Sequence, residues 1–240
     1  MCTVSFIANK GNYYITSNRD EHISRPTAFE PKREIVNGID LLFPKDPKAG
    51  GTWFAINEMG HVGVLLNGAF KRHKSLGNYR KSRGLVLLDI MSKESPEKYL
   101  DEIDLEGIEP FTVVLFQQGR LLEMRWDETK RHRKPLSNSE NYIWSSATLY
   151  DKEVIRHRES LFSNFMGNVL DVNPEDVVDF HSNNHSDFEN GFIIDRKTGL
   201  KTFSVTQAVL KEDDISLGHF DLLNDKKSVI SFNTDQLTLH

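Results

Sequence analysis

Cysteine is the scarcest residue in this sequence. Cys2 is the one cysteine among 240 residues, so the chain can form no intramolecular disulfide. Free thiols are typical of reducing compartments, whereas small secreted domains commonly depend on disulfides. The first residues also lack the basic and apolar segments of a signal peptide. We therefore expect a cytoplasmic protein.

Long apolar segments and an excess of basic residues are missing as well. No apolar run approaches the ~20 residues that a membrane-spanning helix needs. The net charge is −5, with 30 Lys and Arg against 35 Asp and Glu, which gives no reason to expect a nucleic-acid partner. The metal-capable side chains of residues 181–187 match no metal-binding spacing. We expect a small-molecule ligand, and neither a metal nor another cofactor.

Short alternating apolar segments dominate what is present. They predict ten or more strands in consecutive hairpins. The expected strands are residues 2–8, 13–18, 52–57, 61–67, 111–116, 121–126, 142–146, 192–195, 202–209, 216–222 and 228–233. Residues 22–35 are expected to be irregular and extended, and residues 131–134 to be a solvated turn. In this prediction the segment 192–195 forms a hairpin with 202–209.

Helical patterns are few and come between groups of strands. They predict helices over residues 85–91, 95–104, 151–165 and 175–181. In the third, an apolar stripe at Val154, Leu161 and Phe165 is opposed by basic residues on the other face. This order of elements predicts one α+β domain over residues 1–240, with two stacked, mainly antiparallel sheets and helices outside them.

The N-terminus could carry a reactive centre. If Met1 is removed, Cys2 has both a thiol and a free α-amine, whose unperturbed pKa is about 7.7–8.0. The amine can then take the thiol proton, so that nucleophile and base come from one residue. The simpler interpretation is a small buried apolar residue, which is the commonest role of a lone cysteine. A retained Met1 would block the amine.

The expected first hairpin turns at residues 9–12, which brings Ser17–Asp20 near Cys2. Asn18 and Arg19 can donate hydrogen bonds, and Asp20 can accept from an ammonium group or orient the nucleophile. The alternative is a charged loop capped by its own side chains.

Three further segments allow two interpretations each. Gly50-Gly51 permits close backbone approach, either to a substrate or to a neighbouring strand. Asn67 could point into a site, or form a turn with Gly68. The basic segment 69–81 is either a solvated loop or a patch that attracts a carboxylate or phosphate.

Several motifs together resemble one known family. They are Met1–Phe6, Ser17–Glu21, Arg25-Pro26, Gly50–Trp53, Leu66–Gly68 and Ser82–Gly84. This set resembles the NRDE family, that of the Transport and Golgi organisation protein 2. The likeness is strong over about the first 90 residues.

The NRDE family is in turn similar to N-terminal-nucleophile hydrolases, such as the bile-salt and penicillin V amidases. This resemblance implies a four-layer αββα sandwich. It also implies that Cys2 is the nucleophile, that Asp20 holds the α-amine near Asn18 and Arg19, and that Asn67 belongs to the oxyanion hole. The implied substrate-binding residues are Gly51, Thr52, Trp53 and Ser146.

The sequence departs from the amidase pattern at three positions. Ser17 stands where the amidases carry arginine, with Arg19 as a possible substitute. Ser146 stands where a second oxyanion-hole asparagine is usual, and Phe203 where arginine is usual. Losing one oxyanion-hole donor can cost about 10²–10³ in rate.

Two functions therefore remain open. The first is hydrolysis of a small or non-peptide amide by Cys2. The second is non-catalytic binding or trafficking of an apolar or anionic metabolite, such as haem, a lipid or an acyl-CoA, on the same fold.

Overall fold

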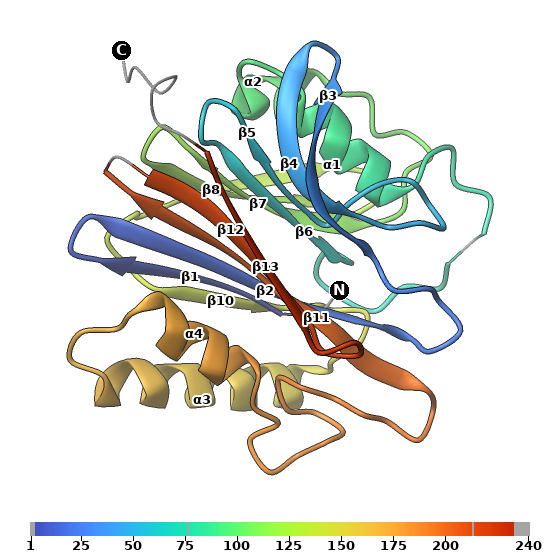
Figure 1. Cartoon of the computed structure of the whole chain (residues 1–240). Coiled ribbons are helices and arrows are strands. Elements are labelled where there is room, and N and C mark those ends of the chain that lie inside the picture. The colour runs from blue at the N-terminus through green and yellow to red at the C-terminus, as the bar shows by residue number, and fades with distance from the viewer. Residues whose placement is uncertain (1–2, 76, 213, 233–240) are drawn as a thin grey trace.

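The computed structural model describes residues 3–75, 77–212 and 214–232 (Figure 1). Cys2, the predicted nucleophile, lies outside the described residues. Within them the chain forms two antiparallel sheets and four helices. None of these helices combines the length and the apolar character that crossing a membrane requires.

The first sheet has six strands and contains both ends of the described chain. In spatial order they are β10 (Tyr142–Ser145), β1 (Thr3–Asn9), β2 (Asn12–His22), β11 (Leu200–Lys211), β12 (Asp214–Asp221) and β13 (Lys226–Phe232). The N-terminal hairpin β1–β2 therefore lies in the middle of this sheet, between strands from the second half of the sequence.

The second sheet has seven strands in the order of the sequence. They are β3 (Phe29–Val36), β4 (Ile39–Lys45), β5 (Phe54–Asn57), β6 (Val62–Asn67), β7 (Phe111–Gln117), β8 (Arg120–Trp126) and β9 (Arg131–Leu136). Every neighbouring pair is antiparallel. The connections are short except that between β6 and β7, which contains two helices.

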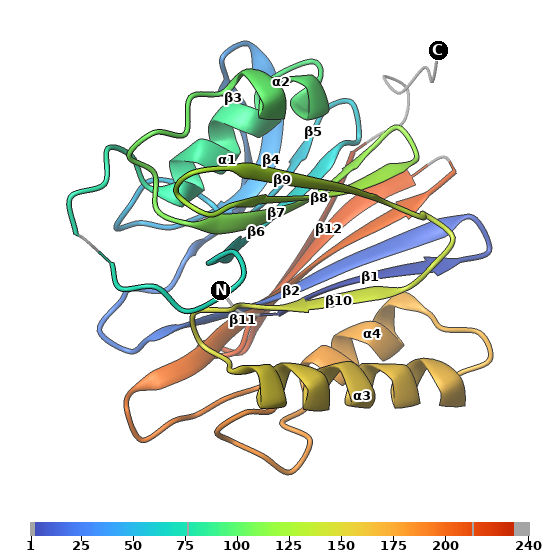
Figure 2. The ribbon, with the colours of Figure 1, turned by 180° about the vertical axis from the view of Figure 1, so that it is seen from behind.

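The two sheets face each other, and a pair of helices covers the outside of each (Figures 1 and 2). The helices α1 (Arg83–Met91) and α2 (Pro96–Glu102) pack on the seven-stranded sheet, and α3 (Lys152–Asn168) and α4 (Pro174–His181) on the six-stranded one. One apolar cluster fills the space between the sheets, and one fills each sheet–helix interface. The predicted α+β fold with four layers is confirmed.

Strand alternation explains how β1 serves two interfaces at once. Val4 and Phe6 belong to the cluster between the sheets, whereas Ile7 belongs to the cluster under α3 and α4. Successive side chains of a strand point to opposite faces. The buried hydroxyl residues Thr3 and Ser5 therefore share the helix side with Ile7.

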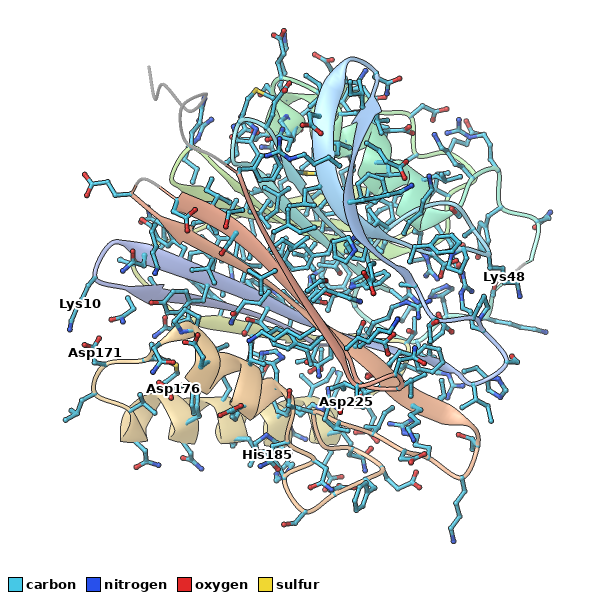
Figure 3. The ribbon with its side chains drawn as sticks, in the orientation of Figure 1. Lys10, Lys48, Asp171, Asp176, His185 and Asp225 are labelled. Atoms are coloured by element: carbon cyan, nitrogen blue, oxygen red, sulfur yellow. The ribbon has the colours of Figure 1, made fainter. Side chains whose placement is uncertain are left out.

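The predicted turn of the first hairpin is confirmed. Lys10 and Gly11 both have positive φ, 51° and 82°, as a two-residue turn between right-twisted strands requires. Figure 3 shows Lys10 and Asp171 pointing toward each other, and their Nζ and Oδ2 atoms are 2.6 Å apart. This ion pair joins the hairpin turn to the connection between α3 and α4.

Two segments expected to lack strands form edge strands instead. Residues 131–136 are exposed and strongly charged, yet they pair with β8 as β9. Charged residues are a common feature of edge strands because they discourage further pairing. At the opposite edge, β3 accommodates Pro31 beside an irregularity between Phe29 and Lys32.

The predicted hairpin of residues 192–195 with 202–209 is wrong. Only one isolated bridge, Asp195 to Lys201, remains of it. Side chains take the place of the ladder, since the Phe192 carbonyl accepts from Asn18 and the Ile194 N–H donates to the Thr202 hydroxyl. Strand β11 pairs with β2 and β12 instead.

Candidate functional site

The start of β1 lies between β2 and β10. Thr3, the residue after Cys2, is opposite Asn18 on one side and Ser145 on the other. The expected proximity of Ser17–Asp20 to the beginning of β1 is therefore confirmed for the described residues.

Asp20 is buried at this end of β2, with 2% of its surface exposed. Its Oδ1 atom accepts a hydrogen bond of 2.6 Å from the Thr202 hydroxyl, and its Oδ2 atom accepts one of 3.0 Å from the Tyr150 hydroxyl. Thr202 is itself fixed, because its Oγ1 accepts from the Ile194 N–H at 2.9 Å. The carboxylate is thus held in one orientation by residues from two distant parts of the sequence.

Arg158, on α3, supports this arrangement and was missed from the sequence. Its Cζ atom lies 3.6 Å from the centre of the Tyr150 ring. The guanidinium donates to the Asn190 carbonyl at 2.8 Å, to the Gly191 carbonyl and to Thr3 Oγ1. Arg158 therefore links the start of β1 to the tyrosine that holds Asp20.

A signal for Arg158 exists in the helical spacing. It lies four residues after Val154 and four before Phe162, so all three share one helix face. The prediction that the basic residues lie opposite the apolar stripe is wrong for Arg158, because Arg158 and Phe162 are the two buried residues of this helix. Leu161 and Phe165 pack beside them as expected.

Arg19 lies on the other face of β2, between the sheets. It is 1% exposed, and its Nη2 atom is 2.7 Å from Asp46 Oδ2. Its Cζ atom lies 4.9 Å from the centre of the Trp53 ring and 5.4 Å from that of Phe203. Phe203, one of the departures from the amidase pattern, thus packs against the guanidinium of Arg19.

Asp46 connects this arginine to a second one and to a turn. Arg25 donates to both Asp46 oxygens, at 2.9 and 3.1 Å, and the N–H groups of Lys48 and Ala49 donate to Oδ1. Burial alone would raise the pKa of Asp46, but these hydrogen bonds and the two guanidinium charges lower it overall. Asp46 is therefore a carboxylate at neutral pH.

Asn18 points to the helix side of the sheet. Its amide donates to the carbonyls of His181, at 2.8 Å, and Phe192, at 3.1 Å, and its Oδ1 contacts the His181 ring. Burial lowers the pKa of His181 to about 3, and the charge of Arg158 adds to the effect. The amide of Asn18 is thus engaged in joining β2 to α4 and the segment after it.

Asn67 and Ser146 meet where β6 and β10 end. The Ser146 hydroxyl donates to the Asn67 carbonyl at 2.7 Å and also contacts the Thr148 hydroxyl at 2.8 Å. The side-chain Oδ1 of Asn67 is buried and has no hydrogen-bond partner in the described part of the chain. Gly68 follows with a φ of 83°, so the Asn-Gly pair also ends the strand, as the second interpretation expected.

The close approach predicted for the glycine pair is to another part of the protein. A Cβ atom on Gly51 would lie 2.6 Å from the Leu85 nitrogen and closer still to Gly84 at the start of α1. The Thr52 N–H donates to the Gly84 carbonyl at 3.2 Å, and its hydroxyl donates to the Pro44 carbonyl at 2.6 Å. Gly51 and Thr52 therefore fix α1 against the start of β5.

A cavity of about 110 Å³ lies beside these residues. Five of the predicted site residues line it, namely Arg19, Gly51, Thr52, Trp53 and Asn67. The wall does not include Asn18 and Asp20, which lie on the helix side of β2, or Ser146, which donates to the Asn67 carbonyl. The site therefore has two faces, with the held carboxylate on one and the cavity on the other.

The basic segment 69–81 is partly neutralised by acidic neighbours. Two of its cations pair with carboxylates, in the pairs Arg80–Asp104 and Lys81–Asp89, and the His73 ring is hydrogen-bonded to Glu109 at 3.0 Å. Within the described ranges, no three His, Cys, Asp or Glu side chains are grouped so as to hold a metal ion.

Comparison with known proteins identifies the family. The sequence profile described as Transport and Golgi organisation 2 matches residues 1–209. The mouse protein "Transport and Golgi organization 2 homolog" is 30% identical over 97 residues, which are 39% of this chain and 33% of the mouse protein. The match thus spans about a third of the length of that curated relative.

Solved structures relate the fold to amide hydrolases. An arginine-to-leucine variant of conjugated bile acid hydrolase from Clostridium perfringens has a TM-score of 0.55 at 12% identity, over 98% of this chain and 94% of that chain. The Caenorhabditis elegans ortholog of N-acylethanolamine-hydrolyzing acid amidase has a TM-score of 0.61 at 10% identity, over 86% of this chain and 92% of that chain. The chain belongs to the Transport and Golgi organisation 2 family, and its fold is that of the N-terminal-nucleophile hydrolases.

Proposed function

We propose that the protein hydrolyses the C–N bond of a small amide, with Cys2 as the nucleophile once Met1 is removed. The thiolate attacks the carbonyl carbon, and the thiol proton passes through the α-amine to the leaving nitrogen. A C–S bond forms and the C–N bond breaks, which releases an amine and leaves a thioester. Water then attacks the thioester, releases the carboxylic acid and restores the thiol.

The observation that carries this proposal is the fixed carboxylate of Asp20. It is buried close to the residue that follows Cys2, and two hydroxyl groups orient it. A carboxylate in such a place is suited to hold an α-ammonium group and to keep the amine directed at the thiol. Within the proposal, Tyr150 and Thr202 are positioning residues for this carboxylate.

The remaining predicted residues take supporting roles in the proposal. The Asn67 amide holds the oxyanion, and Ser146 fixes the backbone that carries it. Asn18 anchors β2 against α4 and so positions Asp20. Arg19 and Trp53 form the wall that contacts the substrate, and Gly51 and Thr52 hold that wall against α1.

The test begins with the native N-terminus. The protein is produced in a reducing cytoplasm, which is the location that we propose, and its intact mass is measured. We expect Met1 to be absent. Conjugated bile acids and N-acylethanolamines, the classes named for the two structural neighbours, serve as first substrates together with simple N-acyl amides, and the released amine is quantified.

Three variants separate chemistry from fold. Cys2→Ala should abolish hydrolysis. Asp20→Asn should reduce kcat by about 10²–10⁴, because the α-amine that acts as the acid–base group loses the carboxylate that holds it. Asp195→Asn is the matched control, because the Asp195 side chain forms an exposed ion pair with Lys201. Hydrolysis that survives Cys2→Ala, or a processed protein that is inert to every amide in the panel, would contradict the proposal.

A binding or trafficking role is the second candidate, favoured by the unpartnered polar atoms of the cavity. Haem, a lipid or an acyl-CoA would then be held without chemistry. Thermal shifts distinguish the two, because a non-reacting ligand stabilises wild type and Cys2→Ala equally. A ligand that is consumed by wild type but only stabilises Cys2→Ala would instead identify a substrate.

A further inference from the structure

Two buried donors on the wall of the cavity lack an acceptor. Arg19 uses Nη2 for Asp46, but its Nη1 has no hydrogen-bond partner among the described residues. The indole N–H of Trp53, which is 2% exposed, is equally unpartnered there. A buried unsatisfied donor costs roughly 1–3 kcal/mol, so two neighbouring ones are uncommon in a native protein.

The two donors are close enough to serve one acceptor group. The guanidinium of Arg19 lies over the Trp53 ring, with 4.9 Å from Cζ to the ring centre. Both residues line the same cavity. A carboxylate presents two acceptor oxygens in one plane, which suits a pair of N–H groups of which one is charged.

The start of α1 reinforces this preference. Ser82, the N-cap of the helix, lines the cavity together with Arg83 and Gly84. A helix N-terminus carries about half a positive charge and favours an anion. The close approach of Gly51 to Gly84 holds this helix end against the cavity wall.

The ion pairs around the cavity neutralise most of its positive charge, so that little remains to attract a dianion. Asp46 is shared by Arg19 and Arg25, and Glu21 lies 3.5 Å from Arg25 Nε. Arg83 is paired with Glu109 at 3.0 Å. The cavity is therefore expected to prefer a ligand group with a single negative charge, which can contact the two unpartnered donors and the N-terminus of α1.

We propose that this cavity binds a carboxylate of the ligand, which accepts hydrogen bonds from Arg19 Nη1 and Trp53 Nε1. The volume of about 110 Å³ is below the ~300–1,000 Å³ of pockets that enclose whole ligands. The cavity therefore takes an end group, while the rest of the ligand lies outside it.

The position of Asn67 narrows the substrate class. Asn67 lines the same small cavity. A ligand whose carboxylate lies at Arg19 can therefore have only a few bonds between that carboxylate and the group that contacts Asn67. If Asn67 holds the oxyanion, the substrate is an amide with a carboxylate close to the scissile bond, as in an N-acyl amino acid. This narrowing rests on the proposed hydrolase function, whereas the carboxylate site does not.

The Trp53 indole is a built-in reporter for the test. The other two tryptophans already have partners, since Trp126 Nε1 donates to the Ile108 carbonyl and Trp144 Nε1 to Glu123. In ¹⁵N-labelled Cys2→Ala protein, which cannot turn over an amide through the thiol, N-acetylglycine is titrated and the three indole resonances are followed. We expect the Trp53 resonance, assigned with Trp53→Phe, to move saturably and the other two to stay.

The neutral analogue N-acetylglycinamide is the matched ligand control and should bind at least about tenfold more weakly, because the charge-assisted bond is lost. Arg19→Gln should weaken N-acetylglycine binding by at least about tenfold. Because Arg19 is buried, its replacement could disturb the fold, and Trp53→Phe therefore provides a second variant that removes a donor and keeps an aromatic ring. This variant lacks the indole resonance, so backbone resonances near Gly84 are used to measure its weaker binding. Arg156→Gln, an exposed position on α3, should bind like the parent.

Four outcomes would overturn the carboxylate site. In the first, the Trp53 resonance does not move at high N-acetylglycine concentration, and in the second, N-acetylglycinamide binds as tightly as N-acetylglycine. In the third, both site variants keep the affinity of the parent for N-acetylglycine. In the fourth, the Trp53 resonance responds to inorganic phosphate and not to N-acetylglycine. Binding without hydrolysis by the wild-type protein would support the site and contradict the hydrolase. Hydrolysis of N-acyl amides with no preference for a nearby carboxylate would contradict the substrate class alone.

Discussion

Arg158 and Tyr150 are stacked, with 3.6 Å between the guanidinium carbon and the centre of the ring. The Tyr150 hydroxyl donates to Asp20, so a buried cation on α3 determines where a buried carboxylate on β2 is held. Arg158 also contacts Thr3. One side chain thereby connects the outer helix layer to both strands of the N-terminal hairpin.

Replacing Arg158 should destabilise the fold. In Arg158→Met the carbonyls of Asn190 and Gly191 lose their donors, and each unsatisfied buried group costs roughly 1–3 kcal/mol. We expect a loss of about 3 kcal/mol in the free energy of unfolding, measured by urea denaturation at pH 7.5. Arg156→Gln, on the exposed side of the same helix, should change it by less than about 0.5 kcal/mol. Equal stability of the two variants would contradict the role given to Arg158.

A methyl group at Gly51 should be poorly tolerated. In Gly51→Ala the new Cβ would lie 2.6 Å from the Leu85 nitrogen and 2.8 Å from the Gly84 oxygen. Both are backbone atoms, so α1 must move, and we expect a loss of about 2–4 kcal/mol.

Gly167 provides the matched control for Gly51. It lies near the end of α3, with nothing within 4 Å of the position of its Cβ. Gly167→Ala should stabilise the protein by about 0.5–1 kcal/mol, because alanine favours the helix. The two alanine variants should therefore shift the urea midpoint in opposite directions.

Removing the charge of Asp46 should leave the buried guanidinium of Arg19 with only the longer contact of 3.8 Å to Glu21 among the described carboxylates. Arg19 is 1% exposed and is paired with Asp46, and breaking a buried pair by losing one member costs about 3–5 kcal/mol. We expect a loss of this size in Asp46→Asn, measured by urea denaturation. Glu102→Gln removes only an exposed contact with Lys98 and should be nearly neutral. An Asp46→Asn protein as stable as Glu102→Gln would show that Arg19 does not depend on this carboxylate.

Three buried histidines should make stability fall as the pH is lowered. Burial lowers the pKa of His61 and of His219 to about 4 and that of His181 to about 3, from an ordinary value of 6.5. Below pH 6.5 the unfolded chain therefore binds protons that the folded protein excludes. Each histidine then removes about 1.4 kcal/mol of stability per pH unit down to its folded pKa.

Urea denaturation at pH values from 7.5 to 5.0 measures this dependence, above the range in which ordinary carboxyl groups titrate. The free energy of unfolding should change little close to pH 7.5 and fall steeply below pH 6.5. His61→Gln should reduce the slope by about one proton, which is about 1.4 kcal/mol per pH unit. A flat profile between pH 7.5 and 5.0 would contradict the neutral state of these residues.

Local sequence patterns were sufficient to predict most of the strands, all four helices and the layered fold. They failed where tertiary pairing decides the structure. The charged segment of β9 has no apolar alternation of its own, and β8 supplies the partner that makes it a strand. Residues 192–195 have the alternation but form one bridge, because the Asn18 side chain and the carbonyls of Asn183 and Phe188 bind their backbone groups.

The candidate site was predicted as one group and occupies two faces. Asn18 and Arg19 are neighbours in a strand, so their side chains point in opposite directions, which the two-residue period of β2 implies. The hydrogen bond from Thr202 to Asp20 could not be predicted, because it depends on the pairing of β11 with β2. Arg158 could have been found from its spacing to Val154 and Phe162.

The pairing of β2 with β11 has a consequence for biosynthesis. Thr202 and Asp20 are 182 positions apart, and the N-terminal hairpin has no neighbour on that side until β11 has left the ribosome. A nascent chain can form its first hairpin and contain Tyr150, yet the second hydroxyl group that orients Asp20 arrives only with the last sixth of the polypeptide. In the proposed hydrolase, removal of Met1 from the growing chain would therefore precede the final fixing of the Asp20 carboxylate.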